Sequence, residues 1–496
     1  MAIIEQITTI VNLHKLPALA LASSFCIFLL SKLLEQNRRD ENEAPKGCGL
    51  VAKYWQWDPV WGIDLVISQV RAIRGHRFLS WLSNLYGSMA VKTFSINMFG
   101  TKWIYITEPE ILKAVYATNF KDFGVTPIAA FRKGLVPFAD KGAITTDGEE
   151  WEHSRLLIKP FFDRQLLPDT GETVDVQPLL QRWFLDIATE FIFSNSMNAL
   201  VHPERSRIAD TMLDVLDGGR LRAQMHQVMW LRNWDWWLKA VQEVHDFVNP
   251  QIEDTLRQID ERDHNVKNGL PAGPERQDLL WSMALMEKDQ EQLRSHLCLI
   301  LIANIDTTSI FISNCIWWLS RHPEAWEKLR REVLGHGDTP LTFETLRNMK
   351  YLNCVMNETH RIIPNNISQL RGCMNDTVVP LGGGPDGKLP MLVRKGDLVL
   401  INKNVMYRDP EYWGDDADKY RPDRFEGHRG SWHFLPFGGG PRRCPAQMMV
   451  QTEAGYLLSS LAKVSRRIEA RDPNPYTPVL RIGASNKTGV KIALFK

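Results

Sequence analysis

The chain has 496 residues, and its 59 Lys and Arg residues nearly balance its 58 Asp and Glu residues, leaving a net charge of +1. This balance gives no reason to expect a nucleic acid as a partner. The seven cysteines are scattered and form no CxxC pair, which argues against a disulfide framework and a zinc site and indicates a reducing compartment.

The N-terminal region contains a mostly apolar stretch, 16–34. It just reaches the length of roughly 17 to 25 residues that a helix needs to span a bilayer. Lys32, Arg38 and Arg39 at its far end favour an uncleaved anchor followed by a cytosolic domain. A cleaved signal peptide is the alternative, but no cysteine framework follows it. Since no low-complexity block divides the rest, we expect a short N-terminal segment (1–15), a transmembrane anchor (16–34), a linker (35–50) and one large domain (51–496).

Most of the large domain has helical spacing, as in 186–194 (DIATEFIFS) and 322–333 (HPEAWEKLRREV). Two β-rich stretches, 91–96 and 103–107, flank NMFG and predict a hairpin. We therefore expect a mainly α fold with small β-sheets. Four cysteines are predicted to be small apolar residues of the core: Cys298, Cys315, Cys354 and Cys373.

The segment 146–162 (TDGEEWEHSRLLIKPFF) predicts a helix that opens on Asp147 and Glu150 at capping-box spacing. Trp151 and Arg155 then lie one turn apart on the same face. Such a pair suits a propionate, because a guanidinium holds a carboxylate through two parallel hydrogen bonds and an indole N–H donates a third. The alternative is a half-buried Trp beside a surface Arg.

Four tryptophans, Trp230, Trp234, Trp236 and Trp237, lie within 229–239. This density of indoles is typical of a bilayer interface. A loop that dips into a membrane and ordinary core packing are both compatible with it.

The stretch 297–319 is apolar on all sides except for a central cluster, 303–308 (ANIDTT). As a second transmembrane span it would place Asp306 near the bilayer midplane at high cost, so we expect a helix buried in the core of a large domain. The Thr307 hydroxyl is predicted to bond the carbonyl of Ala303, four residues back, and to loosen the helix there.

Glu358 and Arg361 are i,i+3 neighbours in a predicted helix, and Arg424 follows a turn-rich meander that includes 407–420. Taken singly, these charges would be solvated surface pairs.

The segment 436–447 (PFGGGPRRCPAQ) holds Cys444 in a short loop of glycines and prolines. The glycines permit positive φ and close approach to a flat ligand, and the prolines stiffen the loop. A thiolate placed in this way is an axial ligand for haem iron, and Arg442 suits a haem propionate. The alternative is a glycine turn that contains a core cysteine.

The pattern of Phe437, Gly440, Arg442 and Cys444 resembles the haem loop of the cytochrome P-450 superfamily, with Ala446 where that family usually has Gly. Five motifs stand in the family's order over much of the chain. The similarity is greatest to the fungal membrane-bound alkane and fatty-acid hydroxylases, through TDGEEWEHSR, DIATEFIFS, PLGGGPDG and FGGGPRRCPAQ.

The resemblance implies a role for each motif. Cys444 is the iron ligand, Asp306 and Thr307 deliver protons, and Asn304 stands where the family often has Gly. The family's buried Glu-Arg-Arg network maps onto Glu358, Arg361 and Arg424, where it would lock the meander beneath the haem loop. The haem contacts are expected from Trp151, Arg155, Arg371, Arg442 and one of Trp432 and His433.

The resemblance further implies a haem b monooxygenase that inserts one oxygen atom from O2 into a C–H bond, with electrons from NADPH through a reductase. It would be anchored in the endoplasmic reticulum with its catalytic domain in the cytosol, and Arg442 and Arg443 would help to dock the acidic reductase. The expected substrate is a long aliphatic or polyketide-like molecule of fungal lipid or specialised metabolism. The pocket is expected to include Ala303, Asn304, Asn365, Asn366 and Ile367.

Three alternatives stay open from sequence. The polar side chains of 362–369 (IIPNNISQ) either contact an oxygenated substrate or bond the backbone. A haem-thiolate isomerase or dehydratase, needing no external reductant, would be expected to lack the Asp306–Thr307 pair. A membrane haem sensor or carrier would not need that pair either.

Overall fold

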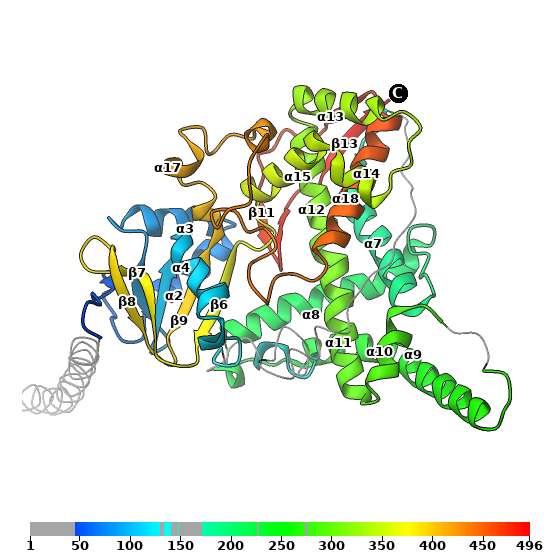
Figure 1. Ribbon diagram of the computed structural model, residues 1–496, viewed down its shortest axis with the longest axis horizontal. Helices are drawn as coiled ribbons and strands as arrows, with labels where there is room; N and C mark the ends of the chain where they lie inside the picture. Colours follow the sequence, from blue (N-terminus) through cyan, green and yellow to red (C-terminus); the bar gives the residue numbers. More distant parts are fainter. Residues whose placement is uncertain (1–44, 129–132, 140–146, 148–170, 226–227, 273–275) are drawn as a thin grey trace, which may run out of the picture.

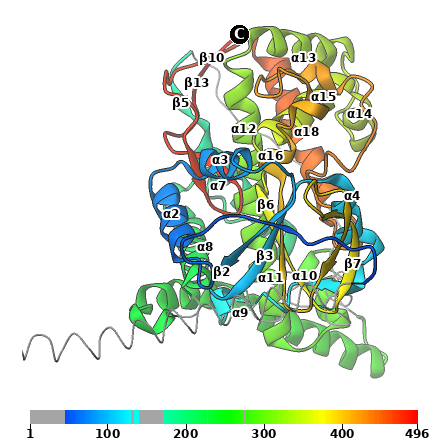
Figure 2. The ribbon, with the colours of Figure 1, turned by 90° about the vertical axis from the view of Figure 1, so that its left-hand side faces the viewer.

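The computed structural model describes residues 45–128, 133–139, 147, 171–225, 228–272 and 276–496. The predicted membrane anchor, Glu150, Trp151 and Arg155 lie outside the described residues. Figures 1 and 2 show a sheet-rich part, built from residues 52–124 and 368–402, beside a larger helical part. The mainly helical fold with small sheets agrees with the prediction from sequence.

The main sheet has six strands in the order β1-β2-β3-β9-β6-β4. The predicted hairpin is present as β2 and β3, paired antiparallel from Phe94↔Tyr105 to Met98↔Thr101. Its turn is only Phe99–Gly100, both with positive φ (53° and 74°), so the strands extend into the stretch predicted as loop. The three smaller sheets have the orders β10-β13-β5, β11-β12 and β7-β8. The strand bounds are β1 Ala52–Lys53, β2 Phe94–Met98, β3 Thr101–Ile106, β4 Phe123–Gly124, β5 Val174–Asp175, β6 Ser368–Cys373, β7 Thr377–Gly383, β8 Leu389–Val393, β9 Leu398–Asn402, β10 Arg467–Ala470, β11 Pro478–Leu480, β12 Ala484–Asn486 and β13 Lys491–Phe495.

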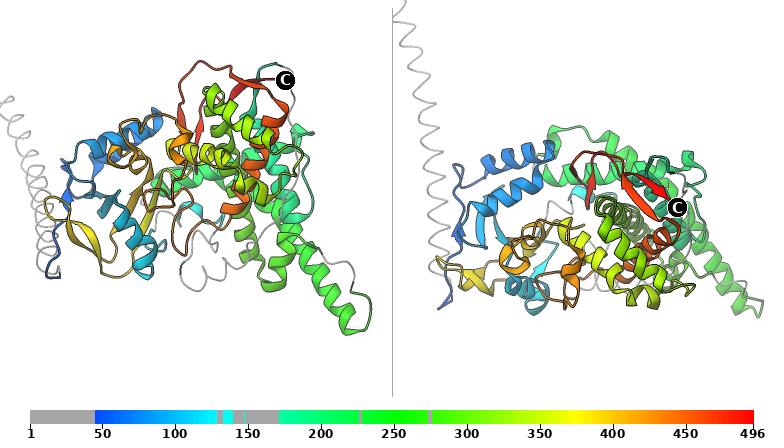
Figure 3. Two further views of the ribbon diagram at one scale, coloured as in Figure 1. Left: turned by 45° about the horizontal axis from the view of Figure 1, so that its top comes forward. Right: turned by 90° about the horizontal axis from the view of Figure 1, so that it is seen from above.

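The helices form most of the larger part, and the far end of α9 projects from the body in Figures 1 and 3. The described α-helices are α2 Ile63–Arg74, α3 Phe78–Gly87, α4 Pro109–Lys113, α7 Val176–Phe193, α8 Arg207–Gln224, α9 Asp235–Lys267, α10 Leu279–Met286, α11 Gln290–Ala303, α12 Ser309–Leu319, α13 Pro323–Gly335, α14 Phe343–Asn348, α15 Lys350–Ile362, α16 Lys403–Met406, α17 Pro410–Trp413 and α18 Gln447–Val464. The π-helical turns are η1 Ala114–Thr118 and η5 Asn304–Thr308, and the 3-10 turns are η2 Phe120–Asp122, η3 Pro203–Ser206, η4 Met229–Leu231 and η6 Pro422–Phe425.

One continuous helix, Gln290–Leu319, consists of α11, the π-turn η5 and α12. Among the described residues it alone is long and apolar enough to cross a membrane by length and composition, but most of it is buried inside the domain. Residues of α11 pack in one large apolar cluster and residues of α12 in another. The π-turn therefore lies where the two cores meet, and the prediction of a buried core helix is confirmed.

The sequence was compatible with either membrane contact or core packing for the tryptophans of 229–239. The structure places two of them in the core and two on the surface. Trp237 is fully buried and donates to the carbonyl of Val215 (3.0 Å), while Trp234 is buried and donates to the carbonyl of Met229 (2.7 Å). Trp230 is 79% exposed, and Trp236 is also exposed. The cysteines 298, 315, 354 and 373 are buried and free, as predicted.

Candidate active site

The Cys444 loop is shaped by two glycines in the left-handed region, Gly438 (φ 79°) and Gly440 (φ 63°). The loop closes through a hydrogen bond from the Cys444 amide to the carbonyl of Phe437 (2.9 Å). A Cβ at Gly440 would collide with the carbonyl oxygen of Tyr116, in the π-turn η1. Gly440 is thus required both for its φ and for the close approach of two backbones.

Replacing Gly440 with alanine is expected to displace the loop and to reduce haem incorporation at least several-fold. The matched control is Gly427→Ala, because Gly427 also has a positive φ (73°) but no atom within 4 Å of an added Cβ. Both variants incur the backbone strain of about 1–2 kcal/mol, and only Gly440→Ala adds the collision. Haem content per folded protein is the measurement. Equal loading of the two variants would contradict the close approach.

Two buried cations act on each other here, and one of them, Lys403, is also affected by Cys444. Arg371 on β6 is 6% exposed and Lys403, at the start of α16, is 1% exposed. Within the part of the chain that the structure describes, neither forms an ion pair. Burial lowers the pKa of Arg371, and burial together with the charge of Arg371 lowers the pKa of Lys403 to about 7, against the opposing effect of Cys444. Asp147 acts on Arg371 from beyond ion-pair distance, and neither cation has an acid in direct contact, so their burial calls for an anionic group.

His360 of α15 completes this side of the site. Its ring stacks on Phe311 of α12 (3.8 Å between centroids) and meets the edge of Phe437 (5.1 Å). Burial and the charge of Lys403 lower its pKa to about 3, so the ring is neutral. The aromatic group ties the central helix to the haem loop.

The residues present therefore fit haem. A thiol in a loop that backbone can approach closely, two unpaired buried cations and a widened turn on the central helix match a flat dianionic macrocycle ligated by sulfur. Cys444 would ligate the iron, and Arg371 would hold a propionate, with Lys403 close by.

Arg442 was predicted to contact a haem propionate, and the structure gives it an acidic partner within the protein. Its side chain is 7% exposed and forms an ion pair with Asp147. Asp147 also accepts from the amides of Val125 (2.9 Å) and Thr126 (2.6 Å). Burial would raise the pKa of Asp147, but the hydrogen bonds from Thr126 and Val125 and the charge of Arg442 lower it. Arg442 thus ties the haem loop, through Asp147, to the residues that follow β4, and of the two arginines Arg443 is the exposed one.

Trp432 and His433 were predicted as alternative haem contacts. Trp432 packs against Gly439 so closely that an added Cβ there would lie 3.0 Å from its ring. The His433 ring stacks on Tyr412 (3.8 Å), and burial lowers its pKa. Trp432 is therefore the one of the two that touches the glycine loop.

The π-turn η5 carries the predicted hydrogen bond from Thr307 Oγ1 to the carbonyl of Ala303 (2.7 Å). Asn365 Nδ2 donates to the backbone carbonyl of Thr307 (2.7 Å). Asp306 is fully buried, and burial raises its pKa to about 6, although the charge of Arg481, 3.9 Å away, acts against this. A hydroxyl and a carboxyl with a pKa near neutrality are thus adjacent on a widened turn, an arrangement able to hold and release a proton.

The other predicted pocket residues differ in their hydrogen bonding and in their exposure. Asn365 bonds the backbone, which favours the structural interpretation for this side chain. Ile367 and Asn304 are buried, whereas Ala303 and Asn366 are partly exposed. Ala303 and Asn366 are thus the better placed of the set to meet a substrate.

Glu358 lies at the centre of a fully buried charge network. It accepts from Arg361 Nε (2.7 Å) and Nη2 (2.9 Å), from Arg424 Nε (3.1 Å) and from the amide of Arg421 (2.7 Å). The two guanidinium groups donate in turn to backbone carbonyls of the meander, those of Tyr407, Trp413, Asp416, Ala417 and Lys419. The predicted contact of the three side chains is present, and it fixes the meander to α15.

Three residues of the site were not found from sequence. Lys403 follows the apolar strand LVLIN, and a cation at the end of a buried strand is the signal that could have found it. Arg481 stands in the polar turn of PVLRIGAS, and Asp147 was noticed only as a helix cap. For Arg481 and Asp147, no local pattern indicates the distant partner.

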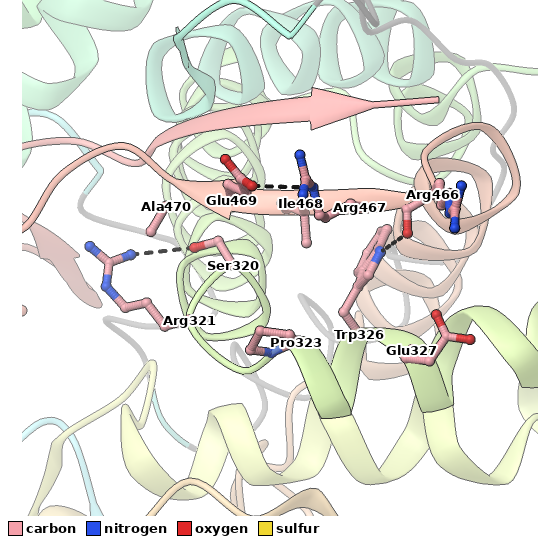
Figure 4. A pocket seen from close by; sticks show the side chains of 10 residues that line it. All are labelled: Ser320, Arg321, Pro323, Trp326, Glu327, Arg466, Arg467, Ile468, Glu469 and Ala470. Carbon is pink, nitrogen blue, oxygen red and sulfur yellow. Dashed lines mark hydrogen bonds and ion pairs between the residues drawn. The ribbon is translucent and has the colours of Figure 1, made fainter.

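An open hollow of about 610 Å³ lies elsewhere, between the start of α13 and β10 (Figure 4). Polar groups that line it contact one another: Arg467 pairs with Glu469 (3.2 Å), and the Trp326 indole donates to the carbonyl of Arg466 (3.2 Å). None of the site residues lines it. This hollow is distinct from the candidate active site.

Comparison with known proteins identifies the family. The family model described as Cytochrome P450 matches residues 56–463. The chain is 62% identical over 504 residues to cytochrome P450 monooxygenase iccC of Talaromyces variabilis, covering 98% of this chain and 100% of that protein. It is 58% identical over 500 residues to monooxygenase iliC of Neonectria sp. (strain DH2) and 54% identical over 499 residues to monooxygenase tenA of Beauveria bassiana, covering 97% of this chain and 98% of the relative in both cases. On this similarity, and on the haem loop and central helix described above, the chain belongs to the cytochrome P450 family.

Proposed function

We propose that this protein is a haem-thiolate monooxygenase of fungal specialised metabolism that inserts one oxygen atom from O2 into a C–H bond of a long aliphatic or polyketide-like substrate. The observation that carries the proposal is the pairing of Asp306 and Thr307 on the π-turn of the central helix, with the Thr307 hydroxyl bonded to Ala303 (2.7 Å). The names of the relatives as monooxygenases support the same reaction class.

When bound, haem supplies a thiolate-ligated iron that activates dioxygen. The residues of this chain do the rest. Cys444 provides the sulfur, and the loop that Gly440 allows keeps it in place. Arg371 holds a propionate, Thr307 offers a hydroxyl for hydrogen bonding, and Asp306 supplies protons, because its pKa of about 6 lets it exchange them near neutral pH.

The substrate is expected to be more polar than an alkane. Asn366 is partly exposed in the segment between α15 and β6, and Arg481 adds a cation at the tip of the β11–β12 hairpin. A simple hydrocarbon would offer no hydrogen bond to Asn366 or to the Arg481 donors that lack an acceptor among the described residues. An oxygenated chain of the polyketide type satisfies them better, which favours specialised metabolism over hydroxylation of alkanes.

An isomerase or dehydratase that needs no reductant is not supported, since the compared relatives are named monooxygenases and the acid–alcohol pair is retained. The deciding experiment supplies the haem-loaded protein with a NADPH-dependent reductase, NADPH and ¹⁸O2, and screens long-chain acids and polyketides chosen by their spectral shift. The proposal predicts one ¹⁸O atom per product and no turnover without NADPH. Conversion that proceeds without NADPH and without ¹⁸O uptake would establish the isomerase instead.

The electron donor is proposed to be a reductase with an acidic face. Arg443 of the haem loop is exposed, donates a hydrogen bond to Gln447 (2.6 Å) and directly precedes Cys444. A cation on this face would steer a negatively charged partner toward the side of the thiolate. Arg442 does not contribute, because it faces Asp147.

The protein is further proposed to sit on the endoplasmic reticulum membrane, anchored by 16–34 with the catalytic domain in the cytosol. The apolar anchor sequence, the positive charges that follow it and the exposed Trp230 and Leu231 support this placement. Indole rings at such a loop are suited to the interface between lipid headgroups and acyl chains.

We expect the double variant Trp230→Ser with Leu231→Ser, in a protein lacking residues 1–44, to bind liposomes at least several-fold more weakly than its parent. Both side chains are exposed (79% and 61%), so the change removes apolar contact with lipid without disturbing the core. Trp234 is kept, because it is buried. Val201→Ser, at a side chain 68% exposed elsewhere, serves as control. Flotation with phosphatidylcholine liposomes is the assay, and unchanged binding would argue against a membrane-dipping loop.

A further inference from the structure

The tip of the β11–β12 hairpin is fixed against the π-turn of the central helix. The tip turn closes through the Arg481 amide, which donates to the carbonyl of Gly483 (2.8 Å). Gly483 packs on Asn365 so tightly that an added Cβ would lie 3.0 Å from Asn365 Oδ1. Asn365 in turn bonds the carbonyl of Thr307 (2.7 Å). The hairpin tip and the proton-handling turn therefore form one contact unit.

The first residue of β12, directly after the tip, is bonded to α12 and to Tyr476. Asn314 Nδ2 donates to the carbonyl of Ala484 (3.0 Å), and Tyr476 Oη donates to the same carbonyl (2.6 Å). The Asn314 side chain is fully buried and Tyr476 is partly buried. The position of the tip is thus set by its contacts with Asn365, Asn314 and Tyr476.

Arg481 Nη1 lies 3.9 Å from Asp306 Oδ1. The Asp306 side chain is 1% exposed and the Arg481 side chain 22% exposed, so the guanidinium lies between the buried carboxyl and solvent. Arg481 Nε and Nη1 are buried and have no hydrogen-bond acceptor among the described residues. The contact is an ion pair beyond hydrogen-bond distance, and these two donors make no hydrogen bond within the described residues.

Burial and groups from two other elements act on the pKa of Asp306. Burial raises its pKa to about 6, the Arg481 charge and the Ile482 amide from the hairpin tip lower it, and Asp217 from α8 raises it. Arg481 also acts on Asp214 of α8. Among the groups that affect the pKa of Asp306, Arg481 is the cation.

We propose that Arg481 is a positioning residue for Asp306, and that the hairpin tip thereby controls the supply of protons to the distal side of the haem. The inference rests on the proposed function, in which Asp306 is the proton donor. Its ion pair favours the ionised carboxylate, so Arg481 decides how much of the acid is ready to accept a proton from solvent. A tip fixed to α12 and to Asn365 keeps that balance constant during turnover.

The test measures the protonation of Asp306 directly. Infrared difference spectra of the ferric, haem-loaded protein are recorded against pH, and the carboxyl band of Asp306 is identified by its loss in Asp306→Asn. In Arg481→Gln the midpoint of this band is expected to move up by about 1 pH unit or more, since an opposite charge at this range lowers an acid's pKa by roughly 1–3 units. Arg481→Lys should restore most of the shift. Arg467→Gln, an exposed arginine on β10, is the matched control and should leave the midpoint unchanged.

A second readout is the peroxide released per NADPH consumed with a reductase present, which should rise several-fold in Arg481→Gln. An unmoved midpoint in a variant that loads haem normally would overturn the inference. If Arg481→Gln does not load haem, Arg481→Met is used, and failure of both to load would make the residue structural and also overturn it. A wild-type protein without a thiolate spectrum would instead overturn the proposed function, so the two failures are distinguishable.

Discussion

Cys444→Ser is expected to abolish the strongly red-shifted Soret band of the reduced, carbon-monoxide-bound protein. The red shift arises from electron donation by a thiolate to the iron, and a serine hydroxyl does not provide it. Because the loop geometry is set by Gly438, Gly440 and the hydrogen bond from the residue 444 amide to Phe437, the variant should still fold. The measurement is the carbon-monoxide difference spectrum of the reduced wild type and variant.

The control for this substitution is Cys48→Ser, since Cys48 is a free, half-buried cysteine far from the haem loop in sequence. It should retain the full band. A wild-type protein that binds haem without the band would show that Cys444 is not the ligand in the reduced state, and the monooxygenase mechanism would fail. Retention of the band in Cys444→Ser would assign the ligand to another residue.

Glu358→Ala is expected to leave little haem-loaded protein. The substitution removes the carboxylate that both Arg361 and Arg424 contact. It leaves the buried Arg361 guanidinium without an acid, whereas Arg424 keeps its ion pair with Asp416 (3.2 Å). Loss of one partner of a buried ion pair costs about 3–5 kcal/mol, a large part of the stability of a typical domain. The meander would then lose its attachment to α15, and the haem loop that follows it would lose its support.

Haem content and the thermal midpoint of the purified protein measure this effect. Glu324→Ala, at an exposed position of α13, is the control and should change the free energy of unfolding by no more than about 0.5 kcal/mol. Glu358→Gln should be intermediate, because it keeps the shape and one acceptor but not the charge. Normal haem content in Glu358→Ala would refute the structural role of the network.

Much of the fold followed from local patterns. Helical periodicity predicted a mainly α chain, and alternation with a turn signal predicted the hairpin of β2 and β3. The apolar helix with a polar centre predicted both its burial and the hydrogen bond from Thr307 to Ala303. These features depend on residues a few positions apart, where spacing alone decides which side chains share a face.

The sequence by itself thus determined the haem loop, the central helix with its acid–alcohol pair and the family to which the chain belongs. Only the tertiary structure decided that Arg442 pairs with Asp147, that Trp234 and Trp237 belong to the core, and that Arg481 faces Asp306. Each of these contacts joins elements far apart in the chain or depends on what covers a surface. The packing of whole helices and strands sets them, and no periodicity in the local sequence records that packing.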